Sequence, residues 1–400
     1  MLYRKNKLGE DISQLGYGCM RFTKNGPKTD MEKTEKEIRR AIELGVNYFD
    51  TAYIYPGSEE ALGTILAKDG LRDRVNIATK LPQYMIKSSA AIEKYFNEQL
   101  TRLKTDSIDY YLMDMLTDVT AWKNLKALGI VEWIEEKKAA GKIRQIGFSY
   151  HGNPEMFIEI LNDYDWDFCQ IQYNYMDENT QAGVTGLKAA AAKNIPVIIM
   201  EPLRGGKLVN SLPKDAKNHI HEYGKLSPAT LAFRWLYNQP EVTCVLSGMN
   251  SVKMVEQNCR AADHSPVGCQ SAEEKELIEK IKKSVLETVK VGCTGCRYCM
   301  PCPKGVDIPA IFASYNNMYT ESKTDARFEF ARLMGIRENS GYATNCVECG
   351  KCMRHCPQHI NIPERLKEAD KALRPLPYKV GTAVARKFML YAKKSGKNDA

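Results

Sequence analysis

The chain has 400 residues and a formal net charge of +8, from 57 basic and 49 acidic side chains. This length suits a large domain followed by a smaller one. No segment approaches the ~20 consecutive apolar residues that a membrane span needs. Neither a secretory signal peptide nor a nucleic-acid-binding motif is visible. We therefore expect a cytoplasmic protein that contacts neither membranes nor nucleic acids.

Residues 1–265 alternate short apolar runs with amphipathic helical patterns. Eight such units in about 250 residues predict a (β/α)8 TIM barrel. A doubly wound sheet is the alternative, but no G-x-G-x-x-G motif follows an early strand. The predicted strands are 14–18, 46–50, 75–79, 108–113, 143–149, 168–173, 196–201 and 242–248.

Helical patterns lie between these strands, and the clearest are 34–44, 90–103, 122–140 and 228–237. Residues 2–12 predict a small hairpin, since Leu8-Gly9-Glu10-Asp11 resembles a turn. Residues 266–291 predict a helical linker, because apolar residues recur there at helical spacing.

Two cysteine runs follow, in a predicted small helical and loop domain at 292–375. The first reads C-x2-C-x2-C-x2-C-P and the second C-x2-C-x2-C-x3-C-P. The second matches the ferredoxin pattern, so we expect two 4Fe-4S clusters. The predicted iron ligands are Cys293, Cys296, Cys299, Cys302, Cys346, Cys349, Cys352 and Cys356. A helical insert at 308–333 separates the runs, and another predicted helix runs from Pro363 to Leu373.

The fourth cysteine of each such run usually binds the other cluster. We therefore assign Cys356 to the cluster of Cys293, Cys296 and Cys299, and Cys302 to the cluster of Cys346, Cys349 and Cys352. Zinc sites normally use two C-x2-C pairs, and disulfides suit small secreted chains, so both fit less well. The other five cysteines lack ligand spacing, and Cys169 and Cys244 are predicted to be buried thiols.

The last segment, 376–400, is a basic tail. Its charged residues are Lys379, Arg386, Lys387, Lys393, Lys394, Lys397 and the single acid Asp399. A solvated, frayed tail is the plainer interpretation. The sharper one is a docking patch for an acidic electron carrier, such as a ferredoxin or flavodoxin, or for a membrane surface.

Chemistry in a barrel enzyme takes place at the C-terminal ends of the strands. Asp50 ends the second predicted strand, Tyr55 lies in the following loop, and Lys80 and Asp114 follow the third and fourth strands. Each residue alone could be a helix cap, a packing residue or a solvated side chain. Together they form a proton-transfer set, in which Lys80 paired with Asp50 would lower the pKa of Tyr55, the general acid.

Several segments resemble the signature motifs of the aldo-keto reductases: Ile42–Tyr55, Ala78–Lys80, Gln170–Asn174 and Glu201–Gly206. The full chain resembles the branch of that family with a C-terminal ferredoxin-type domain of two 4Fe-4S clusters. The resemblance implies hydride transfer between NAD or NADP and a small carbonyl or conjugated-alkene (enone) substrate. Tyr55 would be the proton donor.

The resemblance also implies a nicotinamide site without a Rossmann fold. Ser149 and Gln170 match residues that bind the carboxamide. The matches to the pyrophosphate loop are Leu203, Gly205 and Gly206. The matches on the adenosine side are Ser247, Gly248, Met249, Gln257 and Asn258.

Asp114 departs from the family pattern, in which His is usual at this position. An ionised Asp114 would repel a developing oxyanion, whereas a protonated one would donate a hydrogen bond. Steroid reductases of the family that reduce a conjugated C=C bond carry Glu here, so Asp114 is compatible with alkene reduction. The other interpretation is drift, with His151 supplying the imidazole.

The cofactor pattern departs as well. Tyr150 replaces an Asn, Met200 replaces the Tyr that stacks on the nicotinamide, and Met254 replaces the Arg that pairs with the 2′-phosphate of NADP. Lys253 is adjacent, so both NADH and NADPH stay open.

A nicotinamide delivers two electrons together, whereas each cluster accepts one. A flavin would bridge these two kinds of chemistry, although no flavin motif is visible. The clusters could instead serve another redox partner or a structural role. The non-catalytic alternative is a ferredoxin-linked electron-transfer or redox-sensing protein whose barrel lost carbonyl reduction through Asp114.

Overall fold

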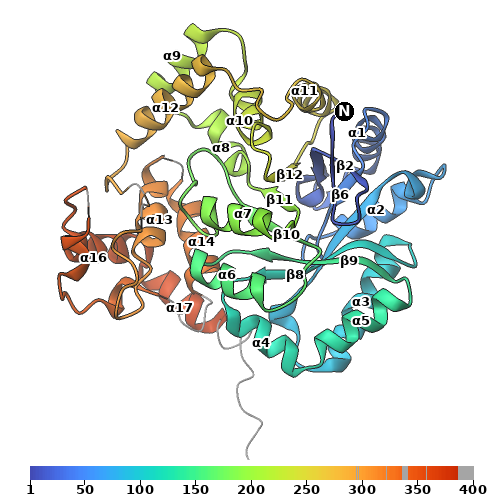
Figure 1. Cartoon of the computed structure of the whole chain (residues 1–400), viewed down its shortest axis with the longest axis horizontal. Coiled ribbons are helices and arrows are strands. Elements are labelled where there is room, and N and C mark those ends of the chain that lie inside the picture. Colours follow the sequence, from blue (N-terminus) through green and yellow to red (C-terminus); the bar gives the residue numbers. More distant parts are fainter. Residues whose placement is uncertain (294, 296, 321, 336–340, 357, 386–400) are drawn as a thin grey trace, which may run out of the picture. The chain divides into compact units, whose positions relative to one another are not determined.

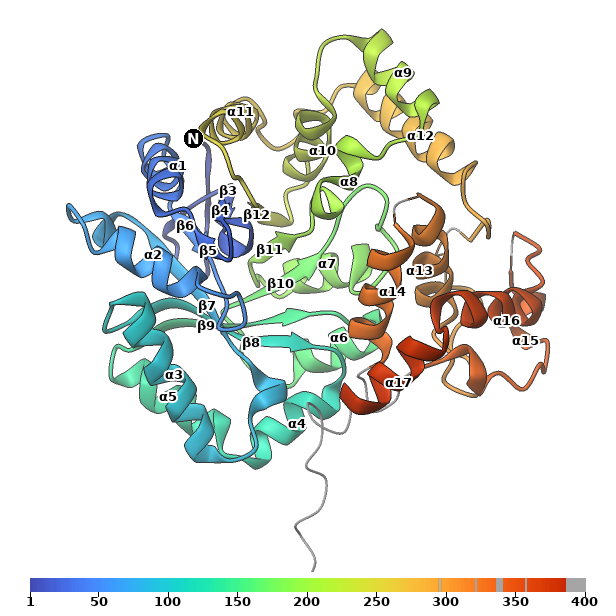
Figure 2. The ribbon, with the colours of Figure 1, turned by 180° about the vertical axis from the view of Figure 1, so that it is seen from behind.

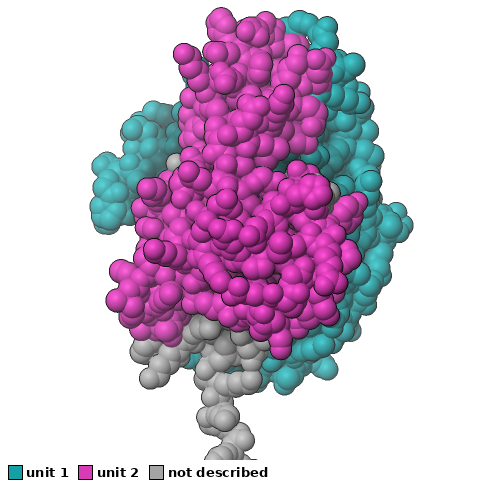
Figure 3. Space-filling view, turned by 90° about the vertical axis from the view of Figure 1, so that its left-hand side faces the viewer, with its two compact units in different colours: residues 1–178, 182–208, 225–275 teal, residues 179–181, 209–224, 276–400 magenta. Residues whose placement is uncertain are grey.

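A computed structural model describes residues 1–293, 295, 297–320, 322–335, 341–356 and 358–385. The chain divides into two compact units, coloured separately in Figure 3. Unit 1 comprises residues 1–178, 182–208 and 225–275. Unit 2 comprises residues 179–181, 209–224 and 276 onward.

Unit 1 is a closed barrel of eight parallel strands that pair in chain order, so the predicted fold is confirmed (Figure 1). All eight predicted strands are present, with ends that differ by a few residues. The barrel strands are β3 (Leu15–Gly18), β6 (Tyr48–Asp50), β7 (Asn76–Leu81), β8 (Ile108–Leu116), β9 (Ile143–Tyr150), β10 (Phe168–Gln172), β11 (Val197–Met200) and β12 (Val242–Ser247).

Helices lie outside this ring of strands (Figure 1 and Figure 2). They are α1 (Met31–Glu43), α2 (Ser58–Leu66), α3 (Ser89–Leu103), α4 (Val119–Ala127), α5 (Ile130–Ala139), α6 (Pro154–Asn162), α7 (Gly183–Ala192), α10 (Pro228–Tyr237) and α11 (Val252–Asp263). The predicted single helix at 122–140 is wrong, because Gly129 adopts a left-handed φ of 79° and separates α4 from α5. The predicted hairpin is confirmed as β1 (Tyr3–Lys5) paired antiparallel with β2 (Asp11–Ser13).

A short strand pair and several single helical turns complete the barrel unit. Strands β4 (Lys24–Asn25) and β5 (Lys28–Thr29) form a small antiparallel ribbon. Single 3-10 turns are η1 (Cys19–Arg21), η2 (Leu71–Arg74), η3 (Gln83–Met85) and η4 (Arg204–Gly206). Helix α8 (Lys207–Asn210) follows η4 at the unit boundary.

Apolar side chains fill the barrel on both faces of its strands. The interior holds Tyr48, Tyr110 and Phe168, whose rings meet edge to face. A larger apolar layer lies between the strands and the helices. Cys169 and Cys244 are buried, as predicted. Because parallel barrel strands are covered on both sides, their polar chemistry is confined to strand ends.

Unit 2 is built from short helices and loops around its own apolar core. Its helices are α9 (Lys214–Tyr223), most of α12 (Ala272–Leu286), α13 (Ile308–Thr320), α14 (Lys323–Phe330), α15 (Lys351–Arg354), α16 (Ile362–Leu373) and α17 (Leu376–Ala385). A π-helical turn, η5 (Ala331–Gly335), follows α14, and a 3-10 turn, η6 (Ala343–Asn345), precedes the second cysteine run. The predicted insert at 308–333 is thus α13 and α14, and the helix predicted at Pro363 is α16. The tail beyond Ala385 lies outside the described residues.

Candidate active site and metal centres

The predicted catalytic residues gather at the C-terminal ends of three neighbouring strands. Asp50 ends β6, Lys80 is the penultimate residue of β7, and Asp114 lies near the end of β8. All three side chains are buried, and Lys80 is only 2% exposed. Tyr55 follows β6 in a loop and is half-buried. The parallel order β6, β7, β8 places these ends side by side.

Lys80 and Asp50 form a buried ion pair. The Lys80 Nζ donates to Asp50 Oδ1 at 2.6 Å and to the Thr51 carbonyl at 2.8 Å. Burial disfavours the ammonium, but the negative charge of Asp50, with further effects of Tyr55 and Asp114, outweighs it and raises the pKa of Lys80 above its ordinary value. Lys80 therefore stays protonated at neutral pH.

Tyr55 lies next to this retained cation. The Lys80 Nζ is 5.6 Å from the centroid of the Tyr55 ring. The Tyr55 backbone N–H donates to the Ala52 carbonyl at 3.0 Å, which fixes the loop. The Lys80 ammonium is thus the positive charge beside the Tyr55 ring.

Asp114 occupies a β-bulge rather than the loop after the strand. We predicted a strand ending at Met113, but β8 continues to Leu116. Its register with β9 shifts between Met113 and Leu116, and Met115 has a left-handed φ of 52°. Bulges re-aim side chains next to active sites. Here the bulge sets Asp114 opposite Ser149.

The two residues predicted to bind the carboxamide instead hold carboxylates in this structure. Ser149 Oγ donates to Asp114 Oδ1 at 3.2 Å and accepts from the Met115 N–H at 2.7 Å. Gln170 Nε2 donates to Asp50 Oδ2 at 2.8 Å. The two oxygens of Asp50 are thus bonded to different partners. A cofactor carboxamide would have to share these groups with the carboxylates.

His151 directly follows β9 on the same rim. It is buried, and its backbone N–H donates to the Leu116 carbonyl at 2.8 Å. The backbone of His151 is thus held beside Leu116, the last residue of β8.

The predicted cofactor loops follow β11 and β12. Leu203 precedes η4, and Gly205 and Gly206 have left-handed φ values of 67° and 93°. Ser247 ends β12, and the buried Asn258 on α11 donates to its Oγ at 3.1 Å. The Met249 carbonyl accepts from the Tyr17 hydroxyl. Gly248 lies between Ser247 and Met249 in the chain, and Gln257 is exposed on α11.

Arg21 is a candidate cofactor residue that the sequence analysis missed. A Cβ at Gly205 would lie 2.8 Å from Arg21 Nη2, and one at Gly248 would lie 3.0 Å from Arg21 Cδ. The exposed Arg21 side chain therefore lies against both predicted cofactor loops. Guanidinium groups bind phosphates in a bidentate manner. The sequence signal was a basic residue just after the first barrel strand, but its neighbours are about two hundred residues away.

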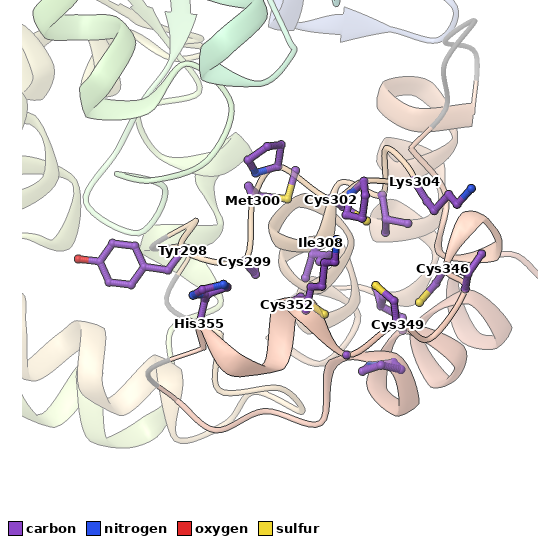
Figure 4. A pocket seen from close by; sticks show the side chains of 18 residues that line it. Tyr298, Cys299, Met300, Cys302, Lys304, Ile308, Cys346, Cys349, Cys352 and His355 are labelled. Atoms are coloured by element: carbon purple, nitrogen blue, oxygen red, sulfur yellow. The ribbon is translucent and has the colours of Figure 1, made fainter.

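Unit 2 contains a cavity of about 340 Å³ lined by thiols. Cys302 from the first run lies there with Cys346, Cys349 and Cys352 from the second, and Cys299 also contributes to the wall (Figure 4). This is the set predicted for one cluster. We call it the outer cysteine set, because Cys349 is exposed.

A second and much smaller cavity, of about 20 Å³, lies beside the thiols predicted for the other cluster. Cys293, Cys299 and Cys356 line it together with apolar side chains such as Phe312 and Ile362. We call these three thiols the inner cysteine set. Cys296, the fourth predicted ligand, lies outside the described residues. Both cavities combine cysteines from the two runs, as the crosswise assignment requires.

Among the residues that the structure describes, no three Cys, His, Asp or Glu side chains converge closely enough to hold one metal ion. A tetrahedral zinc site needs all its thiolates within ~2.3 Å of a single atom. In a 4Fe-4S cluster each cysteine binds a different iron, so the sulfurs surround a larger volume. Thiols spread around a cavity therefore fit a cluster better than a single zinc ion.

Comparisons with known proteins identify the family and the second domain of the chain. The aldo/keto reductase family profile matches residues 14–281, more than half of the chain, so the chain belongs to this family. A 4Fe-4S dicluster domain profile matches residues 292–360. The protein is therefore an oxidoreductase of the aldo/keto reductase family that carries a 4Fe-4S dicluster domain.

Individual relatives resemble the barrel part. The uncharacterized oxidoreductase YqkF of Bacillus subtilis is 28% identical over 65% of this chain and 91% of its own length. L-galactose dehydrogenase of Arabidopsis thaliana is 27% identical over 63% and 85%. An aldo/keto reductase from Klebsiella pneumoniae, solved with NADP and acetate, has 25% identity and a TM-score of 0.57, covering 70% of this chain and 95% of that one.

No helix within the described ranges is long and apolar enough to cross a membrane.

Replacing Arg21 with methionine should weaken NADPH binding about 10-fold or more, because charge-assisted hydrogen bonds to phosphate would be lost. Fluorescence titration of the full chain with NADPH measures this affinity. Lys24→Met is the matched control, since Lys24 is also exposed but donates to Thr29 in the β4–β5 ribbon and to the Pro56 carbonyl in the loop after β6. Equal affinities for Arg21→Met and wild type would contradict the assignment.

The crosswise ligand assignment predicts how pairs of cysteine substitutions combine. Cys302→Ser with Cys349→Ser should remove one cluster and leave about half of the iron, because both thiols serve the same cluster. Cys302→Ser with Cys293→Ser should remove both clusters. Iron content per chain and EPR spectra after anaerobic purification measure this. If Cys302→Ser with Cys349→Ser removed both clusters and Cys302→Ser with Cys293→Ser removed one, each run would hold its own cluster. Cys269→Ser is the control, because Cys269 lies outside both cavities and its loss should leave both clusters intact.

Proposed function

We propose that this protein reduces a small carbonyl compound or a conjugated alkene with hydride from NADPH or NADH, and that Tyr55 donates the proton. The observation that carries the proposal is the buried, protonated Lys80 held beside the Tyr55 ring. The NADP bound in the Klebsiella relative supports a nicotinamide nucleotide as the cofactor. When bound, the nicotinamide supplies the hydride, and the proton completes the two-electron reduction.

The chain's own residues divide the remaining work. Asp50 anchors Lys80, and Gln170 holds the second oxygen of Asp50, so the ammonium has little freedom to turn away from Tyr55. Lys80 in turn stabilises the phenolate that remains after proton donation. Arg21 and the loops at Gly205 and Gly248 would hold the cofactor phosphates. These roles need no Rossmann fold.

Lys253 supports a preference for NADPH over NADH. It lies in the first turn of α11. The next residue, Met254, stands where the family often has a phosphate-binding Arg. A helix N-terminus and a lysine together favour an added phosphate. Lys253 therefore takes the role of the missing Arg in this proposal.

The Tyr55→Phe substitution tests the proposal directly. It removes only the hydroxyl, so turnover should fall by about 100-fold or more, the range of general acid catalysis. NADPH affinity should stay within about 2-fold, since a lost proton donor does not remove cofactor contacts. Steady-state rates with aldehydes, ketones and enones, and fluorescence titration with NADPH, measure both effects. Full activity of Tyr55→Phe would exclude this mechanism. If the wild-type chain bound no nicotinamide nucleotide, the electron-transfer or redox-sensing alternative would be favoured.

The Asp114→His substitution separates carbonyl from alkene reduction. Asp114 replaces the imidazole that polarises a carbonyl oxygen, and Ser149 already donates to it. Restoring the imidazole should raise kcat/KM for aldehydes relative to enones by about 10-fold or more, a conservative share of what an oxyanion donor supplies. An unchanged ratio would argue against a role for Asp114 in substrate choice. His151→Gln is the companion variant: loss of activity there would assign the imidazole to His151.

The role of the clusters is a separate part of the proposal. Each accepts one electron, so they exchange electrons with a one-electron partner, or with a flavin that links them to the nicotinamide. The dicluster profile supports the clusters themselves. A flavin is tested by the absorbance of cofactor released from the anaerobically purified chain.

A further inference from the structure

The two cysteine sets of unit 2 have unlike surroundings. The inner set lies against the buried apolar side chains Ile308, Phe312 and Ile362, and Arg297 and Gln358 also line its small cavity. The outer set borders a cavity of about 340 Å³, Cys349 is exposed, and the adjacent Val347 is 58% exposed. Among the described thiols of both sets, Cys349 is the one that is exposed, whereas the others are partly buried.

The rim of the outer cavity is positively charged. Lys304 and Lys351 line the cavity, both are exposed, and no Asp or Glu lines it. Figure 4 shows Lys304 extending outward at the edge of the thiol cluster. Neither lysine has an acidic partner among the described residues. Glu348, three residues before Lys351, pairs with Lys367 at 2.7 Å, and Asp307, three residues after Lys304, does not line the cavity.

A backbone hydrogen bond reaches a sulfur of the outer set. The Glu348 N–H donates to Cys346 Sγ at 3.4 Å. Hydrogen bonds to cluster sulfurs, nearby charge and solvent exposure all tune the reduction potential of a cluster. Cationic side chains and this N–H would stabilise the more negative, reduced state of a cluster held by the outer set.

We propose that the outer cysteine set is the place where electrons enter and leave this chain, and that Lys304 and Lys351 dock an acidic one-electron carrier. The carrier is a small acidic protein with an exposed iron–sulfur or flavin group. One electron passes from the reduced carrier, which is oxidised, to the iron held by the outer set, which is reduced, and no bond or proton changes. The proposal rests on the cluster role proposed above, but not on the nicotinamide reaction.

This proposal places the docking surface at the cavity rim rather than in the basic tail. The two locations make different predictions, because either can be changed without touching the other. Lys304→Glu with Lys351→Glu reverses two charges at the rim. Lys393→Glu with Lys394→Glu reverses two charges in the tail, so the two double variants have the same net charge.

The test uses the full chain with its clusters intact and an acidic ferredoxin, reduced photochemically and freed of excess reductant. Stopped-flow absorbance under anaerobic conditions follows reduction of the clusters. The rim variant should react about 10-fold more slowly at low salt, because complementary charge raises association rates. The tail variant should react at the wild-type rate, and added salt should slow the wild type toward the rim variant.

The proposal would be overturned if the clusters of the rim variant were reduced at the wild-type rate, or if only the tail variant were reduced more slowly. Equal slowing of cluster reduction in both variants would also overturn it, because that would indicate an effect of net charge. Equal iron content and equal EPR spectra of the chemically reduced variants show that the clusters are intact. NADPH titration of the wild type is independent of this experiment. Ferredoxin oxidation without nicotinamide binding would therefore refute the proposed reductase reaction and leave the docking site standing.

Discussion

The Lys80 ammonium and the Asp50 carboxylate are buried together at the end of two barrel strands, 2.6 Å apart. An ion pair in such a place is tolerated when further hydrogen bonds satisfy both groups, and here Thr51 and Gln170 supply them. Removing one partner of a buried pair typically destabilises a protein by about 3–5 kcal/mol. Tyr55, which is half-buried and lies outside the pair, is therefore the cleaner target for testing the chemistry.

Closure of the barrel makes this pair possible. Asp50, Lys80, Asp114 and Gln170 come from four different strands, and each strand is covered on both faces by apolar side chains. Their polar ends can meet only at the rim, where they exclude water from one another. The low polarity of that environment strengthens every charge interaction, including the one between Lys80 and the Tyr55 ring. The bulge in β8 then adds Asp114 to the group.

The cysteine domain uses a different strategy. Its thiols are arranged around two cavities, and each cavity takes cysteines from both runs. The two cavities differ in size and in lining, and the exposed Cys349 belongs to the larger one. Two chemically similar clusters would experience different surroundings, which is a means of giving electrons a preferred site of exchange.

The sequence alone determined what repeats or has fixed local spacing. Strand positions followed from short apolar runs, and the 4Fe-4S dicluster domain followed from cysteine spacing that few other sites use. Asp50, Tyr55 and Lys80 were identified because each lies near the end of a predicted strand.

Tertiary structure decided what depends on distant neighbours. Arg21 meets Gly205 and Gly248 only when the barrel closes, and Ser149 bonds Asp114 only because β8 bulges against β9. The break between α4 and α5 depends on the left-handed φ of one glycine. Local patterns encode periodicity, whereas partners across the barrel are set by strand register, which no single segment contains.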